Sequence, residues 1–223
     1  MQAVILCAGR GKRLKPHTNF VPKVLLDYNN KSILEHTLEN LKGLVDEVIL
    51  VVGYRKENIM DYFKDNFAGL KIKYAFQNKQ LGTGHAVKCC EKFVKGNFLV
   101  LAGDSIYSKR DINEIIKYGK FSVLGDKVED WRGYGVFIVK DDELKDVVEK
   151  PEKFISNIVN KSLYLFDESI FPILKSLKLS ERNEYEITDA LRELCFKNKV
   201  KVFLSKEKVL HFTNEGDLIS FIN

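Results

Sequence analysis

The sequence predicts a single α/β domain with a Rossmann-like, mainly parallel sheet flanked by helices. Short apolar runs alternate with segments of helical periodicity, as in strands joined by crossover helices. The 223 residues suffice for one large core, and no Gly-, Ser- or Pro-rich linker and no internal repeat divides them. We therefore expect one domain, 1–223, in two halves, 1–120 and 121–223, because the expected strands become shorter after about residue 120.

In the first half, apolar runs predict four strands, at 3–6, 47–52, 72–76 and 98–102. The segment Ser32-Ile-Leu-Glu35 has the spacing of a capping box, and apolar residues then continue at helical intervals to Leu41. A second helix is expected over Ile59, Met60, Phe63 and Phe67. A third should follow the glycines at 82 and 84 and carry Ala86, Val87, Cys90 and Phe93.

In the second half, shorter strands are expected near 121–124, 134–139, 145–149 and 162–166, with a last one at 200–204. Helical periodicity predicts helices at 168–177 and 186–197, and a short one at about 214–222.

The composition excludes several classes of protein. With 45% hydrophobic and 30% charged residues, the chain is not intrinsically disordered. Its longest apolar runs hold about five residues, against the roughly 20 that span a bilayer, and no signal peptide is recognisable. We therefore expect a cytoplasmic protein without membrane contact. The four cysteines have no C-x-x-C spacing, so neither a disulfide framework nor a zinc site is predicted.

The charge pattern gives no reason to expect a nucleic acid partner. The chain has 36 basic and 31 acidic residues, a net charge of +5, and the lysines are scattered among acids. A mild positive excess suits a small polyanionic substrate such as a nucleoside triphosphate, but it also suits ordinary solubility, which is the favoured explanation.

A glycine-rich basic segment follows the first strand directly. Glycines in Gly9-Arg-Gly11-Lys-Arg13 would let backbone N–H groups approach an anion, while the basic side chains would neutralise it. A tight polar turn is the alternative. The segment is not a Walker A loop, and Leu14 stands where the dinucleotide fingerprint needs its third glycine.

The longer string around this segment carries a family resemblance. Leu6-Cys-Ala-Gly9-Arg-Gly11-Lys-Arg13-Leu14-Lys-Pro16-His-Thr18, followed by Pro22-Lys23, resembles the signature of the sugar-1-phosphate nucleotidylyltransferases. The stretch Gln77 to Ala86 is similar to the uridylyltransferase domain of the bacterial N-acetylglucosamine-1-phosphate enzyme. Further segments resemble later landmarks in the same order: Gly103-Asp104, Tyr134-Gly135, Glu149-Lys150-Pro151, Asn160 and Glu184-Tyr185.

This resemblance implies a fold of the nucleotide-diphospho-sugar transferase type and an enzyme that uses Mg²⁺. The implied reaction joins a nucleoside triphosphate and a sugar 1-phosphate, giving a nucleotide sugar and pyrophosphate. A phosphate nucleophile has a second pKa of about 6, so no general base is required at neutral pH. The reaction instead needs alignment of the reacting groups and compensation of charge.

The resemblance also assigns residues in the nucleotide-binding half. Arg13 would contact the triphosphate and the leaving group, Lys23 the region of the α-phosphate, and Asp104 would hold Mg²⁺ at the end of a parallel strand. Gln77, Gln80 and Gly82 would read the base. The remaining nucleotide-binding positions are Leu6, Ala8, Gly9, Gly11 and Thr83.

In the second half, which would bind the sugar phosphate, Glu149 and Asn160 would hold sugar hydroxyls. Gly135, which has no side chain, would let the protein backbone approach the sugar closely, and Lys150 would contact the sugar phosphate. His85 is expected to cap its helix or pack within it.

Two positions depart from the family pattern. The aspartate of the family's closing D-x-G-T segment, a second metal contact, is His211 here, so the second ligand could be His211, a water, Asn214 or Glu215. Ser162 stands where glycine is expected.

The sequence also ends where many relatives add a left-handed β-helix, so a second acyltransferase activity is not expected. Homo-oligomerisation is left open.

The leading hypothesis is a nucleotidylyltransferase that uses UTP or dTTP and a hexose or N-acetylhexosamine 1-phosphate. One alternative is a cytidylyltransferase acting on another phosphate monoester, although Glu149-Lys-Pro151 and Tyr134-Gly135 favour a sugar. Another is a catalytically weak regulatory subunit that binds nucleotide sugars, which His211 and Ser162 suggest. A non-catalytic α/β binding domain would require the ordered matches to be coincidental.

Overall fold

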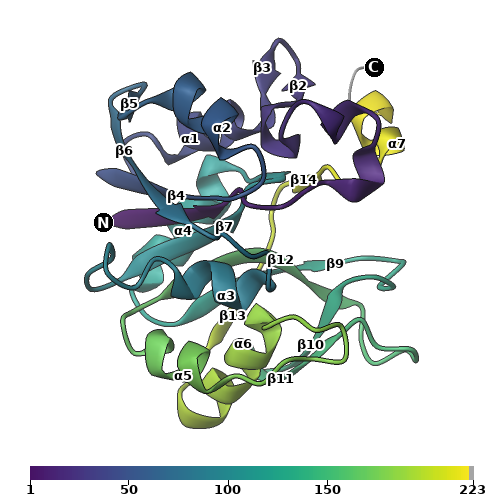
Figure 1. Ribbon diagram of the computed structural model, residues 1–223. Coiled ribbons are helices and arrows are strands. Elements are labelled where there is room, and N and C mark those ends of the chain that lie inside the picture. Colours follow the sequence, from purple (N-terminus) through teal and green to yellow (C-terminus); the bar gives the residue numbers. More distant parts are fainter. Residues whose placement is uncertain (221–223) are drawn as a thin grey trace.

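A ten-stranded mixed sheet runs through the structure, a computed structural model that describes residues 1–220 (Figure 1). The strand order is β10-β11-β13-β9-β12-β7-β1-β4-β6-β5. The strands of this sheet are β1 (Gln2–Leu6), β4 (Glu47–Val52), β5 (Asn66–Phe67), β6 (Leu70–Phe76), β7 (Phe98–Ala102), β9 (Ser122–Lys127), β10 (Gly135–Lys140), β11 (Glu143–Glu149), β12 (Ile158–Phe166) and β13 (Lys201–Leu204).

Within residues 1–220, two small two-stranded sheets, seven α-helices and three short 3-10 helices complete the fold. The small sheets pair β2 (Asp27–Tyr28) with β3 (Lys31–Ser32), and β8 (Ser105–Ile106) with β14 (Leu210–His211). The helices are α1 (Ile33–Leu41), α2 (Lys56–Phe63), α3 (Thr83–Lys88), α4 (Lys109–Tyr118), α5 (Ile170–Ser176), α6 (Ile187–Lys197) and α7 (Glu215–Ser220). Positions 221 and 222 of the last predicted helix lie outside the described residues.

The predicted α/β domain is confirmed, and its sheet is mixed. The four strands expected in the first half form its parallel part, because β1 lies between β4 and β7 and β6 follows on β4. The strands of the second half join this part through β12, which runs antiparallel to both β7 and β9.

Alternation along the central strands builds one hydrophobic core on each face of the sheet. Ala3 and Ile5 of β1 belong to the core formed with α1, α2 and α4, whereas Val4 belongs to the core formed with α3, α5 and α6. Side chains on a strand point alternately to opposite faces, so β4, whose residues after Glu47 are all apolar, is buried on both sides. None of the described helices is long and apolar enough to cross a bilayer.

Three expected element boundaries were wrong. Helix α2 ends at Phe63 because Lys64 takes a positive φ of 52°, and Phe67 lies in β5, where its ring still packs on Phe63. Helix α3 ends at Lys88, and the hydrogen bonds of Cys90 and Phe93 reach back only three residues, as in turns. Strand β12 begins at Ile158, before the range expected.

Helix α4 was not expected, although its signals are present in the sequence. Ser108 caps the helix by accepting a hydrogen bond of 3.0 Å from the backbone of Asp111, and Gly119 ends it at φ 71°. Ile112 and Ile115 are its buried apolar residues. Together with Ile116, which packs against the same core, they have helical spacing, but the charged residues around them make this short period easy to miss.

The capping box that the sequence predicts at the start of α1 is present, and its contribution to stability can be tested. Ser32 accepts a hydrogen bond of 3.2 Å from the Glu35 backbone, and the Glu35 carboxylate accepts one of 2.6 Å from the Ser32 backbone. We expect Ser32→Ala to lower the free energy of unfolding by about 1 kcal/mol, because the first turn loses an acceptor. Urea denaturation measures the change.

Ser169→Ala is the matched control. Ser169 stands at the N-cap of α5, but its side chain makes no capping hydrogen bond. Its substitution should change the free energy of unfolding by less than about 0.5 kcal/mol. Equal effects of the two substitutions would show that the Ser32 cap does not stabilise the protein.

Candidate active site

The candidate site lies where the parallel strands end. Leu6 of β1 is in register with Val51 of β4 and Ala102 of β7, and Val52 of β4 is in register with Phe76 of β6. The segments that leave these strands therefore emerge at one edge of the sheet, which is where open α/β sheets bind ligands.

Hydrogen bonds brace the basic loop that follows β1. It contains three short 3-10 helices, η1 (Lys12–Leu14), η2 (His17–Asn19) and η3 (Lys23–Leu25). Thr18 donates a hydrogen bond of 2.9 Å to the carbonyl of Gly11, which has a positive φ of 59°. Tyr54 and Arg55, which follow β4, donate to the carbonyls of Thr18 and Asn19. The loop is thus held in a defined shape beside the sheet edge.

A first cavity of about 430 Å³ collects the predicted nucleotide-binding and catalytic residues. Its lining includes all of them: Leu6, Ala8, Gly9, Gly11, Arg13, Lys23, Gln77, Gln80, Gly82, Thr83 and Asp104. Glycine is required at Gly82, where φ is 97° and an added Cβ would lie 2.6 Å from the carbonyl oxygen of Tyr185.

An ion pair between Lys23 and Asp104 lies in this cavity. The Lys23 Nζ and Asp104 Oδ2 atoms are 2.6 Å apart, and the side chains are 13% and 29% exposed. Burial alone would raise the pKa of Asp104, but Lys23 and His211 outweigh burial and hold this pKa below its ordinary value. Asp104 is therefore ionised at neutral pH.

His211 lies next to this ion pair. This is the place expected for it, because it stands at the family's second metal-binding aspartate. Its Nδ1 is 3.9 Å from Asp104 Oδ1 and 2.5 Å from the hydroxyl of Ser105. Burial lowers the pKa of His211, more than Asp104 raises it. Asn214 lines neither cavity, and its side-chain oxygen accepts a hydrogen bond from Asp217 in α7. Glu215 pairs with His17 at 3.2 Å.

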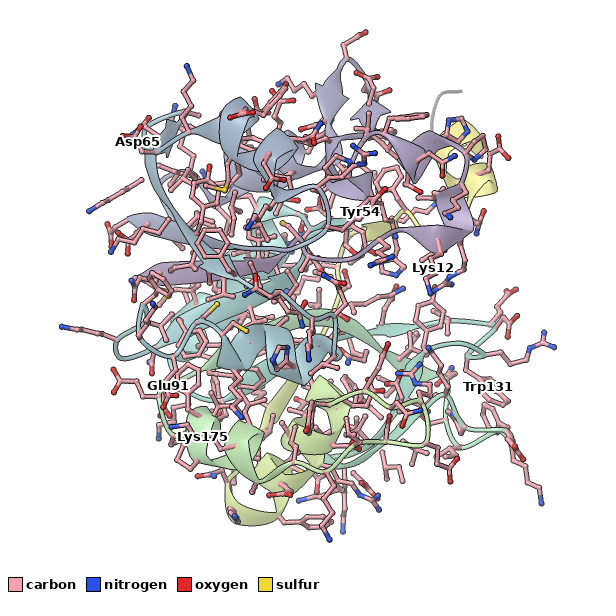
Figure 2. The ribbon with its side chains drawn as sticks, in the orientation of Figure 1. Lys12, Tyr54, Asp65, Glu91, Trp131 and Lys175 are labelled. Atoms are coloured by element: carbon pink, nitrogen blue, oxygen red, sulfur yellow. The ribbon has the colours of Figure 1, made fainter. Side chains whose placement is uncertain are left out.

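A second cavity of about 470 Å³ adjoins the first and collects the predicted sugar-phosphate residues. Gly135, Glu149, Lys150 and Asn160 line it, and Arg13 and Thr83 line both cavities. In Figure 2, Lys12 of the basic loop and Trp131, the neighbour of Arg132 in the second cavity, lie on the same side of the molecule.

Glu149 is held by neutral and charged partners. Thr188 donates a hydrogen bond of 3.1 Å to its Oε2, and Lys150 Nζ is 3.8 Å from its Oε1. Burial raises the pKa of Glu149, although Arg182 and Lys150 oppose that shift. The Asn160 side chain bonds to Tyr164 at 2.6 Å and to the backbone of Ser162 at 2.8 Å, so its amide plane is fixed.

The structure explains why glycine is expected where Ser162 stands. Ser162 has a φ of 56°, in the region that favours glycine, and it lies within an irregular part of the β12 pairing with β9. It lines both cavities. Serine in place of the expected glycine therefore adds a side chain at the junction between the two cavities.

Besides Arg132, two basic residues of the second cavity were missed from the sequence. Arg182 lies 2.7 Å from Glu186, 3.2 Å from Glu149 and 3.8 Å from Glu184, three carboxylates that hold its guanidinium at the cavity wall. In the sequence, Arg182 is only a basic residue among acidic ones before a predicted helix, and this pattern does not indicate a binding site.

Lys161 is the other missed residue. Its side chain is 8% exposed, 3.5 Å from Asp126 and 4.9 Å above the ring of Tyr134. It lies between Asn160 and Ser162, just before the expected strand 162–166, so no apolar pattern marked it as a buried residue.

The site fits Mg²⁺ through one carboxylate. Mg²⁺ keeps several waters and commonly takes one or two protein carboxylates together with substrate phosphates. Asp104 supplies such a carboxylate, ionised and at a cavity wall. Within residues 1–220, no group of three His, Cys, Asp or Glu side chains forms a cage for a metal ion.

Comparisons with known proteins agree with this geometry. The family model described as nucleotidyl transferase matches residues 2–209. A bifunctional protein GlmU of Methanococcus maripaludis is 44% identical over 203 residues, covering 90% of this chain and 48% of that protein. The chain thus spans about half the length of the GlmU relatives that it matches.

A relative of similar length and a solved structure give the same result. The UTP–glucose-1-phosphate uridylyltransferase AglF of Haloferax volcanii is 35% identical over 201 residues, covering 86% of this chain and 82% of that one. A crystal structure of UDP-glucose pyrophosphorylase complexed with UDP-glucose superposes with a TM-score of 0.89 at 25% identity, covering 99% and 96% of the two chains. With the family model matching nearly all of its length, the chain belongs to the nucleotidyl transferase family.

Proposed function

We propose that the protein transfers a nucleotidyl group from UTP or dTTP to a sugar 1-phosphate, in a reaction that uses Mg²⁺. The observation that carries the proposal is the pair of adjoining cavities, which have volumes suited to small-molecule ligands. One holds the Lys23–Asp104 pair, the other holds Glu149 and Arg182, and Arg13 lines both. The names of the AglF relative and of the complexed pyrophosphorylase support a uridine nucleotide and a sugar phosphate.

In the proposed reaction, a phosphate oxygen of the sugar 1-phosphate attacks the α-phosphorus of the triphosphate. The new P–O bond forms as the bond from the α-phosphorus to the leaving pyrophosphate breaks. The nucleophile is largely deprotonated at neutral pH, so no side chain has to remove a proton. Catalysis then rests on alignment and on compensating the charge of two anions that meet.

Arg13 is suited to the junction of the two substrates. It is exposed, it lines both cavities, and within residues 1–220 no acidic side chain forms an ion pair with it. Its guanidinium has five N–H donors and can bind two phosphate oxygens at once. Lys150 and Arg182 would bind the sugar phosphate from the far side of the second cavity, where Glu149 and Asn160 would bind hydroxyls.

Asp104 would hold Mg²⁺, which supplies positive charge to the triphosphate when it is bound. Asp104 already carries its negative charge, because Lys23 keeps its pKa low. Lys23 would then contact both the carboxylate and a phosphate oxygen. His211 would remain bonded to Ser105 and orient the neighbouring segment.

The direct test is release of pyrophosphate with Mg²⁺ and a panel of nucleoside triphosphates and sugar phosphates. We expect release with UTP or dTTP and a hexose or N-acetylhexosamine 1-phosphate. Release with CTP and phosphocholine would instead indicate a cytidylyltransferase. Tight binding of nucleotide sugars without turnover would indicate a regulatory subunit, and no release and no binding with any pair would contradict the proposal.

Asp104→Asn should lower kcat by about 10²-fold or more, because the charge that holds the metal is lost. The fold should be retained, since Asp104 is a cavity residue outside both hydrophobic cores. Steady-state kinetics and circular dichroism check the two statements. Asp65→Asn is the matched control, because Asp65 is exposed, lines neither cavity and lies on the opposite side of the molecule from Lys12 of the basic loop in Figure 2. A variant with normal kcat would exclude Asp104 from the reaction.

The Lys23–Asp104 pair also predicts a pH-dependent stability. The folded pKa of Asp104 is lowered, so the pair stabilises the protein above the ordinary pKa of an aspartate, and this contribution is lost as the pH falls through the folded pKa. Lys23→Met should lower the free energy of unfolding at pH 7 by about 1.5–3 kcal/mol, the range for a hydrogen bond to a charged group. The difference from wild type should shrink below about pH 4.

Lys31→Met provides the comparison for this measurement. Lys31 and Glu39 form an ion pair of 2.8 Å, but both side chains are more than a third exposed. Its loss should change the free energy of unfolding by less than about 1 kcal/mol at any pH. Denaturant unfolding of both variants between pH 3 and pH 7 tests the contrast. A Lys23→Met effect that is independent of pH would refute the assigned cause.

A further inference from the structure

The side-chain amide of Gln77 is held by two acceptors beside the first cavity. Gln77 follows β6, is 4% exposed, and lines that cavity. Its Nε2 donates a hydrogen bond of 2.9 Å to the carbonyl of Gly82 and lies 3.0 Å from Nδ1 of His85 in α3. The backbone of Gln77 is anchored as well, because its N–H donates to the Val52 carbonyl at 2.9 Å.

These contacts determine which way the amide faces. The carbonyl of Gly82 can only accept, so the amide must present its nitrogen to it. In the reversed orientation, two oxygens would face each other. The Gly82 carbonyl is fixed in turn, because it also accepts from the backbone of Ala86 at 3.2 Å, and glycine is required at this position.

The second N–H of the amide points to the ring of His85. For this contact to be a hydrogen bond, Nδ1 must carry a lone pair, so the proton of the neutral ring is on Nε2. Burial, with a smaller contribution from Lys88, lowers the pKa of His85, which favours the neutral ring. His85 was expected to cap or pack its helix; its ring contact with Gln77 gives it another role.

Both donors of the amide are therefore engaged, and its oxygen is left for the cavity. Within residues 1–220, no donor bonds to this oxygen, although the residue is almost fully buried. The cavity thus presents a fixed acceptor. The N3–H of uracil or thymine can donate to it, whereas N3 of cytosine carries a lone pair and would be repelled.

We propose that His85 is a positioning residue that sets the preference for uracil or thymine over cytosine by locking the orientation of the Gln77 amide. The inference rests on the proposed function, because it takes the first cavity as the nucleotide site. UTP and CTP are the suitable probes, since their bases have the same size and differ in the hydrogen-bonding character of N3 and the 4-position.

Two substitutions of His85 by side chains of similar shape test whether His85 fixes the orientation of the Gln77 amide. His85→Asn keeps an acceptor near the position of Nδ1, whereas His85→Leu has the size of asparagine and no acceptor. The dissociation constants of UTP and CTP are measured by calorimetry with Mg²⁺ and without sugar phosphate. We expect wild type and His85→Asn to prefer UTP, and His85→Leu to lose up to about tenfold of that preference, because only the Gly82 carbonyl then holds the amide and turning it breaks one hydrogen bond instead of two.

The outcomes separate the inference from the proposed function. An unchanged UTP preference in His85→Leu would overturn the inference alone, as would equal losses in both variants, which would show a packing role. Failure of the wild type to bind any nucleoside triphosphate would overturn both. The ¹⁵N spectrum of the His85 ring gives a test that needs no variant: a proton on Nε2 is expected, and a proton on Nδ1 would overturn the lock.

Discussion

The register of the four parallel strands is the constraint on which the site depends. Strands β7, β1, β4 and β6 end together, so segments far apart in the sequence, at Gly9, Gly53, Gln77 and Asp104, leave the sheet at one edge. Side chains on both faces of β7, β1 and β4 are buried, and a shift by one residue would exchange their two cores. The position of each cavity residue is therefore tied to core packing.

Charge is distributed over the two cavities in a way that suits two anionic ligands. Basic side chains from both halves of the chain reach the cavities, and most are paired with carboxylates: Lys23 with Asp104, Lys161 with Asp126, and Arg182 with Glu149 and Glu186. Lys12 and Arg13 are the exceptions within the described residues, since no ion pair joins either to a carboxylate. Pairing holds the cations in place before a ligand arrives, which reduces the reorganisation that binding requires.

Much of this could be predicted from the sequence because its signals are local. The strand at 98–102 and the capping box at Ser32 were found with their boundaries, and the signature from Leu6 to Lys23 indicated the first cavity. Arg182 could not be found in this way, because its place in the second cavity depends on how a loop folds against β11. The contact between Gln77 and His85 likewise follows from the turn between them, which positions both side chains.

The antiparallel pairing of β12 limits how the two halves can move. Leu163 is paired with Leu101 of β7, and Tyr164 is paired with Val100 of β7 and Val123 of β9, so strand pairing joins one half to the other, with an irregularity between Asn160 and Tyr164 on the β9 side. A hinge between the halves would have to break this ladder. Entry and exit of ligands must then depend on the loops around the two cavities, while the backbone of the sheet below these loops stays rigid.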